Sequence, residues 1–416
     1  MADQDIAAPE TAVGGLDPFA PGFYENPYAQ YEALRDHDPV HHSVFGSWMV
    51  TRWDDVHALL RKPGTSVEDR NVTSIDETRR EQMAKLVEGR EVRRSRAILN
   101  IDPPDHTRLR KLVSKAFTPR AVERIRTQAG ELVDEILEDL ATREGPVDLV
   151  SELAFPLPFT VISEMLGMPE GDRDQLRAWS HTITQVLDPI LAMQHAEAIF
   201  DASDRMREVV AEAIAWKRTR DDDDLLAAMI AAEEHGDVLS DIELVDNVVL
   251  LYLAGHETTV NLIGNGTAAL LRHRDQLDRL VADPSLDANA IEELLRWDSP
   301  VQFSRRIAME PIEVAGHAIG PGEFVTTVLG SANRDPRKFG PTAGELDLAR
   351  PDAREHVSFG SGVHHCLGAA LARLEGQEAI GRLVRRFPAM ELAGDPVQNG
   401  RIVLRGLDEL PVSLAG

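Results

Sequence analysis

Hydrophobic residues recur along most of the chain at the spacing of an α-helix. Leu132, Val133, Ile136, Leu137 and Leu140, for example, repeat at steps of three and four positions and would share one helix face. Other segments show the same spacing, so we predict a helix-rich protein. The expected helices cover about 26–39, 53–60, 158–167, 172–187, 190–219, 224–233, 241–272, 288–297 and 367–387.

Two parts of the chain predict strands instead. Residues 40–44 and 48–51 flank a Phe-Gly-Ser turn, and residues 310–329 alternate with Gly-His and Pro-Gly turns. The predicted fold class is therefore mainly α with a minor β part. No Gly/Ser-rich or Pro-rich linker divides the chain, so we expect one large domain over 16–416 behind a flexible tail over 1–15.

Charge and composition exclude several classes of protein. The chain carries 44 Lys and Arg against 70 Asp and Glu, a formal charge of −26, which disfavours binding to nucleic acid or to an anionic membrane. The longest strongly apolar stretch, Val248–Ala254, is too short to span a bilayer. The single cysteine, Cys366, cannot form an intramolecular disulfide or hold an iron–sulfur cluster. A lone thiol fits a reducing compartment, so we expect a cytoplasmic protein.

The segment around Cys366 carries the most chemical information. It reads Phe359-Gly360-Ser361-Gly362-Val363-His364-His365-Cys366-Leu367-Gly368 and immediately precedes the last predicted helix. A helix N-terminus lowers the pKa of a cysteine and favours the thiolate, which is the chemistry of an axial ligand to haem iron. Two alternatives are a buried cysteine in a glycine-rich turn and a zinc site, although three adjacent residues cannot readily converge on one tetrahedral ion.

Polar residues interrupt the most apolar of the predicted helices at its centre. Gly255 weakens that helix, and the Thr258 hydroxyl can bond back to the carbonyl of Ala254. A carboxylate at Glu257 beside this hydroxyl would form a short proton relay. The alternative is a helix bend in which Glu257 is paired with a basic group.

A third feature, Glu293 three positions before Arg296, is common on helix surfaces when it stands alone. In this order along the chain, however, the three features resemble the cytochrome P450 family of haem-thiolate monooxygenases in its soluble bacterial form. Residues 359–368 match the family pattern F-G-x-G-x-H-x-C-x-G at every fixed position, and residues 254–259 match its oxygen-activation motif. Glu293 and Arg296 match the family's E-x-x-R pair, and the resemblance covers essentially the whole chain.

The resemblance implies haem b as the cofactor and Cys366 as the axial ligand of its iron. It also implies a structural ion pair between Glu293 and Arg296 that Arg350 joins, although Leu346 stands where the family usually has an aromatic residue. The anionic haem propionates would bind cationic or hydrogen-bonding side chains. The residues implied in cofactor binding are His106, Arg110, Ala254, Arg306, Phe359, Gly360, His364, Cys366 and Gly368.

The implied reaction inserts one oxygen atom from O2 into an organic substrate by hydroxylation or epoxidation, with Glu257 and Thr258 as catalytic residues. Electrons would come from an external ferredoxin and its NAD(P)H-dependent reductase, and the protein would act as a monomer. A cluster of cations on residues 106–126 would steer an acidic partner, unless it is only a solvated helix face. The docking residues expected there are Arg108, Lys111 and Lys115.

The substrate pocket should be mainly apolar with a few polar anchors, but the sequence does not identify the substrate. Two other functions stay open at this point. One is a haem-thiolate enzyme driven by hydrogen peroxide, and the other is a haem or gas sensor without catalysis. The residues expected to line the pocket are Leu250, Leu253, Ala254, Val301 and Gln302.

Overall fold

The computed structural model describes residues 15–43, 46–74, 94–114, 117, 119–168, 173–234 and 237–415. Its fold is mainly α with a minor β part, as the sequence predicts. The flexible tail expected over 1–15 lies almost entirely outside the described residues. The principal helices are α1 (Tyr28–His37), α2 (Trp53–Arg61), α4 (Asp105–Ser114), α5 (Pro119–Leu140), α6 (Pro156–Leu166), α7 (Arg173–Thr184), α8 (Pro189–Gln194), α9 (Ala196–Lys217), α10 (Leu225–Ala231), α11 (Asp241–Arg272), α12 (Arg274–Ala282), α13 (Asp287–Trp297), α14 (Leu329–Ala332), α15 (Pro336–Phe339) and α16 (Ala369–Arg386).

The helix predicted over 241–272 is α11, with the same bounds. Its start is fixed by a capping box, in which the Ser240 hydroxyl accepts from the Glu243 N–H and the Glu243 carboxylate accepts from the Ser240 N–H. The prediction missed α12, which follows α11 after the single residue His273. The helix predicted over 190–219 is divided at His195 into α8 and α9.

The largest sheet has five strands in the order β1-β2-β10-β7-β3. β10 runs parallel to β2, while the other neighbours are antiparallel. The predicted strand pair at 40–44 and 48–51 forms β1 and β2, with Val40 opposite Val50. The strands of this sheet are β1 (Val40–His42), β2 (Ser47–Val50), β3 (Thr65–Ser66), β7 (Phe303–Ala308) and β10 (Phe324–Val328).

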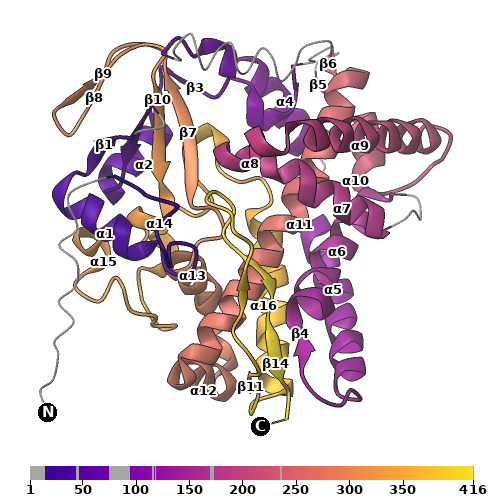
Figure 1. The fold of residues 1–416 in the computed structure, drawn as a ribbon. Coiled ribbons are helices and arrows are strands. Elements are labelled where there is room, and N and C mark those ends of the chain that lie inside the picture. Colours follow the sequence, from indigo (N-terminus) through magenta and orange to yellow (C-terminus); the bar gives the residue numbers. More distant parts are fainter. Residues whose placement is uncertain are drawn as a thin grey trace, which may run out of the picture.

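Smaller two- and three-stranded sheets complete the β part. β8 and β9 form a hairpin that projects beyond the main sheet (Figure 1). Near the C-terminus, β12 and β13 pair with each other, and β14 lies between β11 and β4. Their bounds are β4 (Val147–Asp148), β5 (Glu233–Glu234), β6 (Asp237–Val238), β8 (Ile312–Val314), β9 (His317–Ile319), β11 (Glu391–Leu392), β12 (Val397–Gln398), β13 (Leu407–Glu409) and β14 (Pro411–Ser413).

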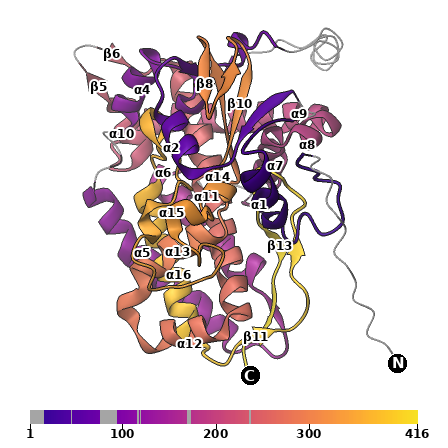
Figure 2. The same ribbon diagram turned by 90° about the vertical axis from the view of Figure 1, so that its left-hand side faces the viewer.

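The main hydrophobic core lies among α5, α11, α13 and α16. Val133, Leu262, Leu294 and Leu383, one from each of these helices, are almost completely buried. Figure 2 shows α11, α13 and α16 together in the middle of the helical part, with α1 and α2 on the side of the main sheet. Because α16 begins directly after the Cys366 segment, this core also fixes the position of that segment.

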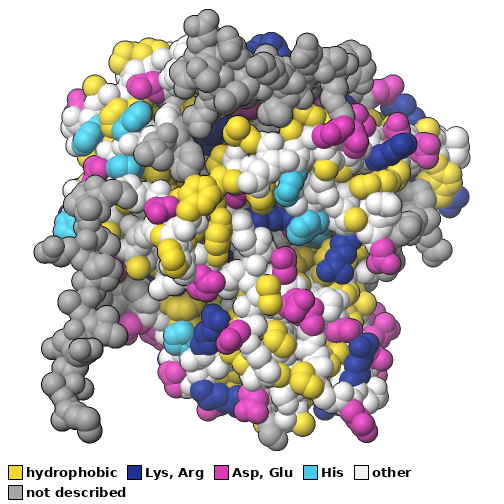
Figure 3. Space-filling view, viewed as in Figure 1, with side chains coloured by type: hydrophobic (Ala, Val, Ile, Leu, Met, Phe, Trp, Pro, Cys, Tyr) yellow, Lys and Arg dark blue, Asp and Glu magenta, His cyan; other side chains and the backbone are white. Residues whose placement is uncertain are grey.

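The excess negative charge is not gathered in one patch on the face that Figure 3 shows. Acidic and basic side chains alternate there over the helical part of the molecule. Within the described residues, no helix combines the length and apolar character needed to cross a bilayer.

Candidate active site

The Cys366 segment forms a tight loop between a 3-10 turn, Gly362–His364, and α16. The Cys366 N–H donates to the Phe359 carbonyl at 2.9 Å, which closes the loop on itself. Gly362 has a φ of +70°, and a Cβ there would lie 2.7 Å from the Leu60 carbonyl oxygen at the end of α2. Only glycine both adopts this positive φ readily and leaves room for the Leu60 carbonyl. The loop therefore packs directly against the end of α2.

The Cys366 side chain is exposed on one side, but protein packs closely around the rest of it. Burial raises the pKa of the thiol, against a hydrogen bond from the Gly368 N–H and the charges of Arg110 and Arg373, which lower it. The sequence prediction of a lowered pKa is therefore wrong for the free thiol, because desolvation outweighs the helix N-terminus. A coordinating metal would deprotonate the thiol outright.

Four side chains predicted to reach the haem propionates lie together beside this loop. The rings of His106 on α4 and His364 are 4.3 Å apart between centroids. Burial, together with His106, Arg306 and Arg110, lowers the pKa of His364 to about 3. Arg110 donates to the His365 carbonyl at 2.6 Å, and Arg306 is buried on β7. Because His106, Arg306 and Arg110 all lower the pKa of His364, these imidazole and guanidinium groups lie close together beside the cysteine loop.

This cluster has unused hydrogen-bonding capacity. His106 is 1 % exposed, yet neither ring nitrogen has a hydrogen-bond partner among the described residues. A buried polar group without a partner is costly and calls for a ligand. The chemistry of these donors fits an anionic carboxylate group, and the neighbouring thiol fits a thiolate ligand to iron. The residues present thus fit a haem.

The centre of α11 holds the predicted Thr258 hydrogen bond, from its hydroxyl to the Ala254 carbonyl at 3.1 Å. Ala254 is exposed and Leu250, Leu253 and Thr258 are half-buried, although most of the C-terminal half of α11 is buried. These positions share one helix face, so that face borders open space.

Gly255 has a packing role in this part of α11. A Cβ there would lie 3.0 Å from the Ile162 side chain of α6, so the missing side chain permits a close approach of the two helices.

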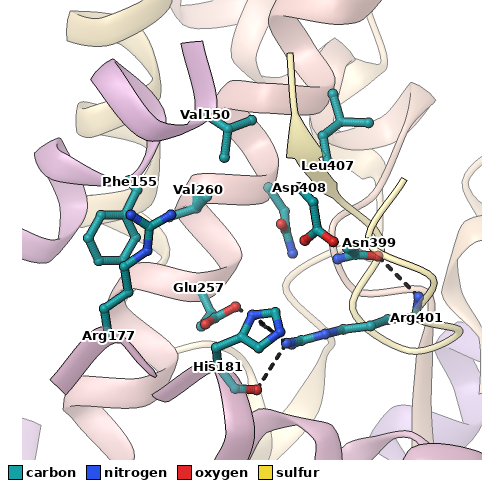
Figure 4. A pocket seen from close by; sticks show the side chains of 11 residues that line it. Val150, Phe155, Arg177, His181, Glu257, Val260, Asn399, Arg401, Leu407 and Asp408 are labelled. Atoms are coloured by element: carbon teal, nitrogen blue, oxygen red, sulfur yellow. Dashed lines mark hydrogen bonds and ion pairs between the residues drawn. The ribbon is translucent and has the colours of Figure 1, made fainter. Parts of the chain in front are cut away.

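Glu257 points into a polar pocket between α11, α7 and the β12–β13 hairpin (Figure 4). Its carboxylate lies 3.7 Å from the Arg401 guanidinium, so Glu257 is paired with a basic group, as the alternative interpretation of this helix proposed. Arg401 also donates to the Thr184 hydroxyl and to the His181 carbonyl, at 2.8 and 3.0 Å. The pocket's lining includes Glu257 but neither Cys366 nor Thr258.

Glu293, Arg296 and Arg350 form one buried network. The Arg296 guanidinium binds both Glu293 oxygens, at 2.6 and 2.8 Å, and both side chains are completely buried. Arg350 donates to Glu293 at 3.1 Å, so it joins the pair even with Leu346 in place of an aromatic residue. Arg296 also donates to the carbonyls of Asn333 and Ala343.

Two side chains with predicted roles make contacts within the protein. Gln302 is 1 % exposed, and its amide nitrogen donates to the Ser299 carbonyl at 2.6 Å and to the Tyr28 hydroxyl at 3.2 Å, while its amide oxygen has no partner among the described residues. Arg108 is paired with Asp237 and with Glu243, so its charge is neutralised within the protein.

The predicted docking surface and the predicted substrate pocket have further members. Lys111 is exposed on α4, and Lys115 lies outside the described residues. Val301 is half-buried and bridges to Leu404.

Sequence reasoning missed a second ion cluster behind the loop. It consists of Glu292 on α13, Arg373 on α16 and His356. The one signal in the sequence was the doublet Glu292-Glu293, since two adjacent acids on a buried helix need separate partners. Glu375 was also missed, and it is completely buried on α16.

Comparison with known proteins supports this arrangement. The family model described as "Cytochrome P450" matches residues 71–283 and 284–400. The chain is 43 % identical to Cytochrome P450 107B1 of Saccharopolyspora erythraea, over 95 % of this chain and 96 % of the relative. It is 41 % identical to the Vitamin D(3) 25-hydroxylase of Pseudonocardia autotrophica, over 98 % and 99 % of the two chains.

A solved structure shares the whole fold. The bacillaene polyketide synthase cytochrome P450 PksS of Bacillus subtilis 168 superposes with a TM-score of 0.85 at 36 % identity, covering 97 % of this chain and 100 % of that one. These matches extend over both the helical part and the sheet.

Proposed function

Because this chain belongs to the cytochrome P450 family, whose members are haem-thiolate monooxygenases that bind haem b, we propose that Cys366 is its axial ligand. We further propose that it inserts one oxygen atom from O2 into an organic substrate by hydroxylation or epoxidation. The observation that carries the assignment is the cluster beside Cys366, in which buried His106 nitrogens lack partners among the described residues. When bound, the haem supplies the reductive activation of dioxygen.

The chain's own groups have distinct parts in this proposal. His106, Arg110, Arg306 and His364 hold the propionates by charge-assisted hydrogen bonds. The Gly368 N–H donates to the Cys366 sulfur and stabilises its anion.

Thr258 and Glu257 are consecutive residues of α11, about 100° apart around its axis, and each handles protons in its own surroundings. The Thr258 hydroxyl donates its hydrogen bond to the Ala254 carbonyl. Its lone pairs can therefore accept a hydrogen bond on the face of α11 that borders open space. Glu257 faces the polar pocket, where it can take up a proton from water. Its carboxylate also lies 3.7 Å from the Arg401 guanidinium, which holds it toward this pocket.

Electrons reach the protein, in this proposal, from an external ferredoxin with its NAD(P)H-dependent reductase, in the cytoplasm. The cations predicted for this docking surface are Arg108, Lys111 and Lys115, and the exposed Lys111 on α4 is the one to test first. A reduction rate that falls as ionic strength rises, and falls further in a Lys111→Glu variant, is the expected behaviour. If the reduction rate depends neither on ionic strength nor on the Lys111→Glu substitution, this surface is excluded as the docking site.

The substrate is proposed to be a large and mainly apolar organic molecule. The named relatives differ, since one is a vitamin D(3) 25-hydroxylase and another belongs to a bacillaene polyketide synthase. The half-buried Leu250 and Leu253 and the exposed Ala254 supply an apolar wall on α11. A spectral titration with steroid, terpenoid, fatty-acyl and macrolide ligands would select among these classes.

One experiment tests the assignment directly. Holoprotein purified from cells supplied with a haem precursor should show the red-shifted Soret band of a ferrous carbonyl thiolate haem, and Cys366→Ala should lose it. Turnover should require O2, NAD(P)H, ferredoxin and reductase. A colourless wild-type protein, or an unchanged band in Cys366→Ala, would refute the ligand. Turnover with hydrogen peroxide but not with reduced ferredoxin would favour the peroxide-driven alternative.

A further inference from the structure

The ion cluster of Glu292, Arg373 and His356 lies directly behind the cysteine loop. Arg373 binds both carboxylate oxygens of Glu292, with its Nε at 2.8 Å and an Nη at 3.1 Å. His356 Nε2 lies 3.1 Å from the same carboxylate, and the Ser358 N–H donates to His356 Nδ1 at 3.1 Å. Since Nδ1 accepts, the neutral ring carries its proton on Nε2 and donates it to Glu292.

The cluster has a defined charge state. Burial would raise the pKa of Glu292, but hydrogen bonds from His356 and Arg373 outweigh it and hold this pKa at about 2. Burial lowers the pKa of His356, so this ring is neutral near pH 7. The Glu292 anion therefore binds the Arg373 guanidinium, with a neutral imidazole beside it and the largely exposed Arg354 guanidinium at 3.7 Å.

Arg373 connects this cluster to the loop. Its guanidinium lies 4.5 Å from the centroid of the Phe359 ring, and the His356 ring lies 5.6 Å from the same ring on another side. Phe359 in turn supplies the carbonyl that accepts from the Cys366 N–H. Arg373 is also one of the charges that lower the pKa of the Cys366 thiol. Arg373 is thus the member of the ion pair that contacts the loop, through Phe359.

We propose that Arg373, clamped by Glu292, is a positioning residue that holds the Phe359 end of the cysteine loop and keeps a positive charge beside the Cys366 sulfur, so that it raises the reduction potential of the bound haem. The inference rests on the proposed ligand role of Cys366. A positive charge favours the reduced state because reduction adds one electron to the neighbouring group. The clamp matters because a solvated arginine side chain would otherwise sample many rotamers.

The chain offers a matched control on the same two helices. Arg385 of α16 binds both oxygens of Asp287 of α13, at 2.9 and 2.7 Å. The exposed fraction of its side chain, 30 %, equals that of Arg373. This pair joins α13 to α16 as the Glu292–Arg373 pair does, but Arg385 lies almost at the far end of α16 from Cys366.

The sign of one substitution separates positioning from net charge. Arg373→Gln removes the positive charge and should lower the potential. Glu292→Gln removes a negative charge, so a simple sum of charges predicts a higher potential. If Glu292 acts by clamping, however, its loss releases the guanidinium toward water and the potential should fall as well.

The test is a spectroelectrochemical titration of the holoenzyme in five forms: wild type, Arg373→Gln, Glu292→Gln, Arg385→Gln and Arg373→Lys. We expect a lower potential in the first two variants, an unchanged potential in Arg385→Gln, and partial recovery in Arg373→Lys, which keeps the charge without the bidentate clamp. An unchanged potential in Arg373→Gln overturns the proposal, as does a raised potential in Glu292→Gln. If Glu292→Gln fails to fold, Arg373→Gln against Arg385→Gln decides alone.

The ferrous carbonyl spectrum separates this inference from the proposed function. A wild-type protein without a thiolate-type Soret band would refute the ligand and the inference together. A normal band in the wild type with equal potentials in Arg373→Gln and Arg385→Gln would refute the inference alone.

Discussion

Glu292 and Glu293 are consecutive residues of α13, yet their carboxylates serve two separate arginine networks. Glu293 binds Arg296 and Arg350, whereas Glu292 binds Arg373 and His356. Successive helix positions lie about 100° apart around the axis, which sends the two side chains to different neighbours. One carboxylate therefore organises the chain between β10 and α16, and the other supports the cysteine loop.

Replacing Glu293 should lower the free energy of unfolding of the protein. Glu293→Gln leaves the buried Arg296 and the nearly buried Arg350 without their anion, and an uncompensated buried charge costs about 3–5 kcal/mol. Chemical denaturation of the holoprotein, followed by circular dichroism, measures this loss. The exposed Glu313→Gln on β8 is the control and should change the free energy of unfolding by less than about 0.5 kcal/mol. Equal midpoints for the two variants would contradict the prediction.

The sequence was most informative where a local pattern decides the structure. The bounds of α11 and the Thr258 bond to Ala254 follow from spacing and from interactions within one helix. The contacts of Gln302 with Tyr28 and of Arg108 with Asp237 could not be predicted in this way, because these partners lie far away in the sequence. The pKa of Cys366 was misjudged for a related reason, since burial is a property of the folded chain.

Loss of the Thr258 hydroxyl should divert electrons from product to hydrogen peroxide. In Thr258→Ala nothing at this position can accept or return a proton on the open face of α11, while Thr258→Ser keeps the hydroxyl. The measurement is the ratio of product formed to NAD(P)H consumed, together with the peroxide released. We expect a low ratio in the alanine variant and a ratio near wild type in the serine variant. Equal ratios in all three proteins would remove Thr258 from proton handling.

Glu257→Gln should slow turnover while leaving substrate affinity intact. The amide keeps the size of the side chain but cannot carry a proton inward, and loss of a general acid–base group costs roughly 10²–10⁴-fold in rate. Arg401→Gln is the informative comparison, because Arg401 also ties the β12–β13 hairpin to His181 and Thr184 on α7. Arg401→Gln should therefore weaken substrate binding and also slow turnover. Substrate dissociation constants from spectral titration, set beside kcat, distinguish the two, and an unchanged kcat in Glu257→Gln would exclude the relay.

Glu375 should make the protein less stable as the pH rises. Burial raises its pKa to about 8 from an ordinary 4.5, only partly opposed by the nearby Thr259 hydroxyl, and neither carboxyl oxygen makes a hydrogen bond of normal geometry within the described part of the chain. Between these two values the unfolded chain has released the proton that the folded chain still holds, so stability falls with increasing pH across that window. From pH 5 to pH 7.5 the loss is on the order of 3 kcal/mol.

Glu375→Gln has no proton to lose and should abolish that part of the slope. Other titrating groups are common to both proteins, so the difference between wild type and variant isolates Glu375. The measurement is the free energy of unfolding of the holoproteins at pH 5 and pH 7.5. We expect the variant to gain relative to wild type at the higher pH. Parallel pH profiles would mean that Glu375 is already ionised in the folded protein, with a partner that balances its charge.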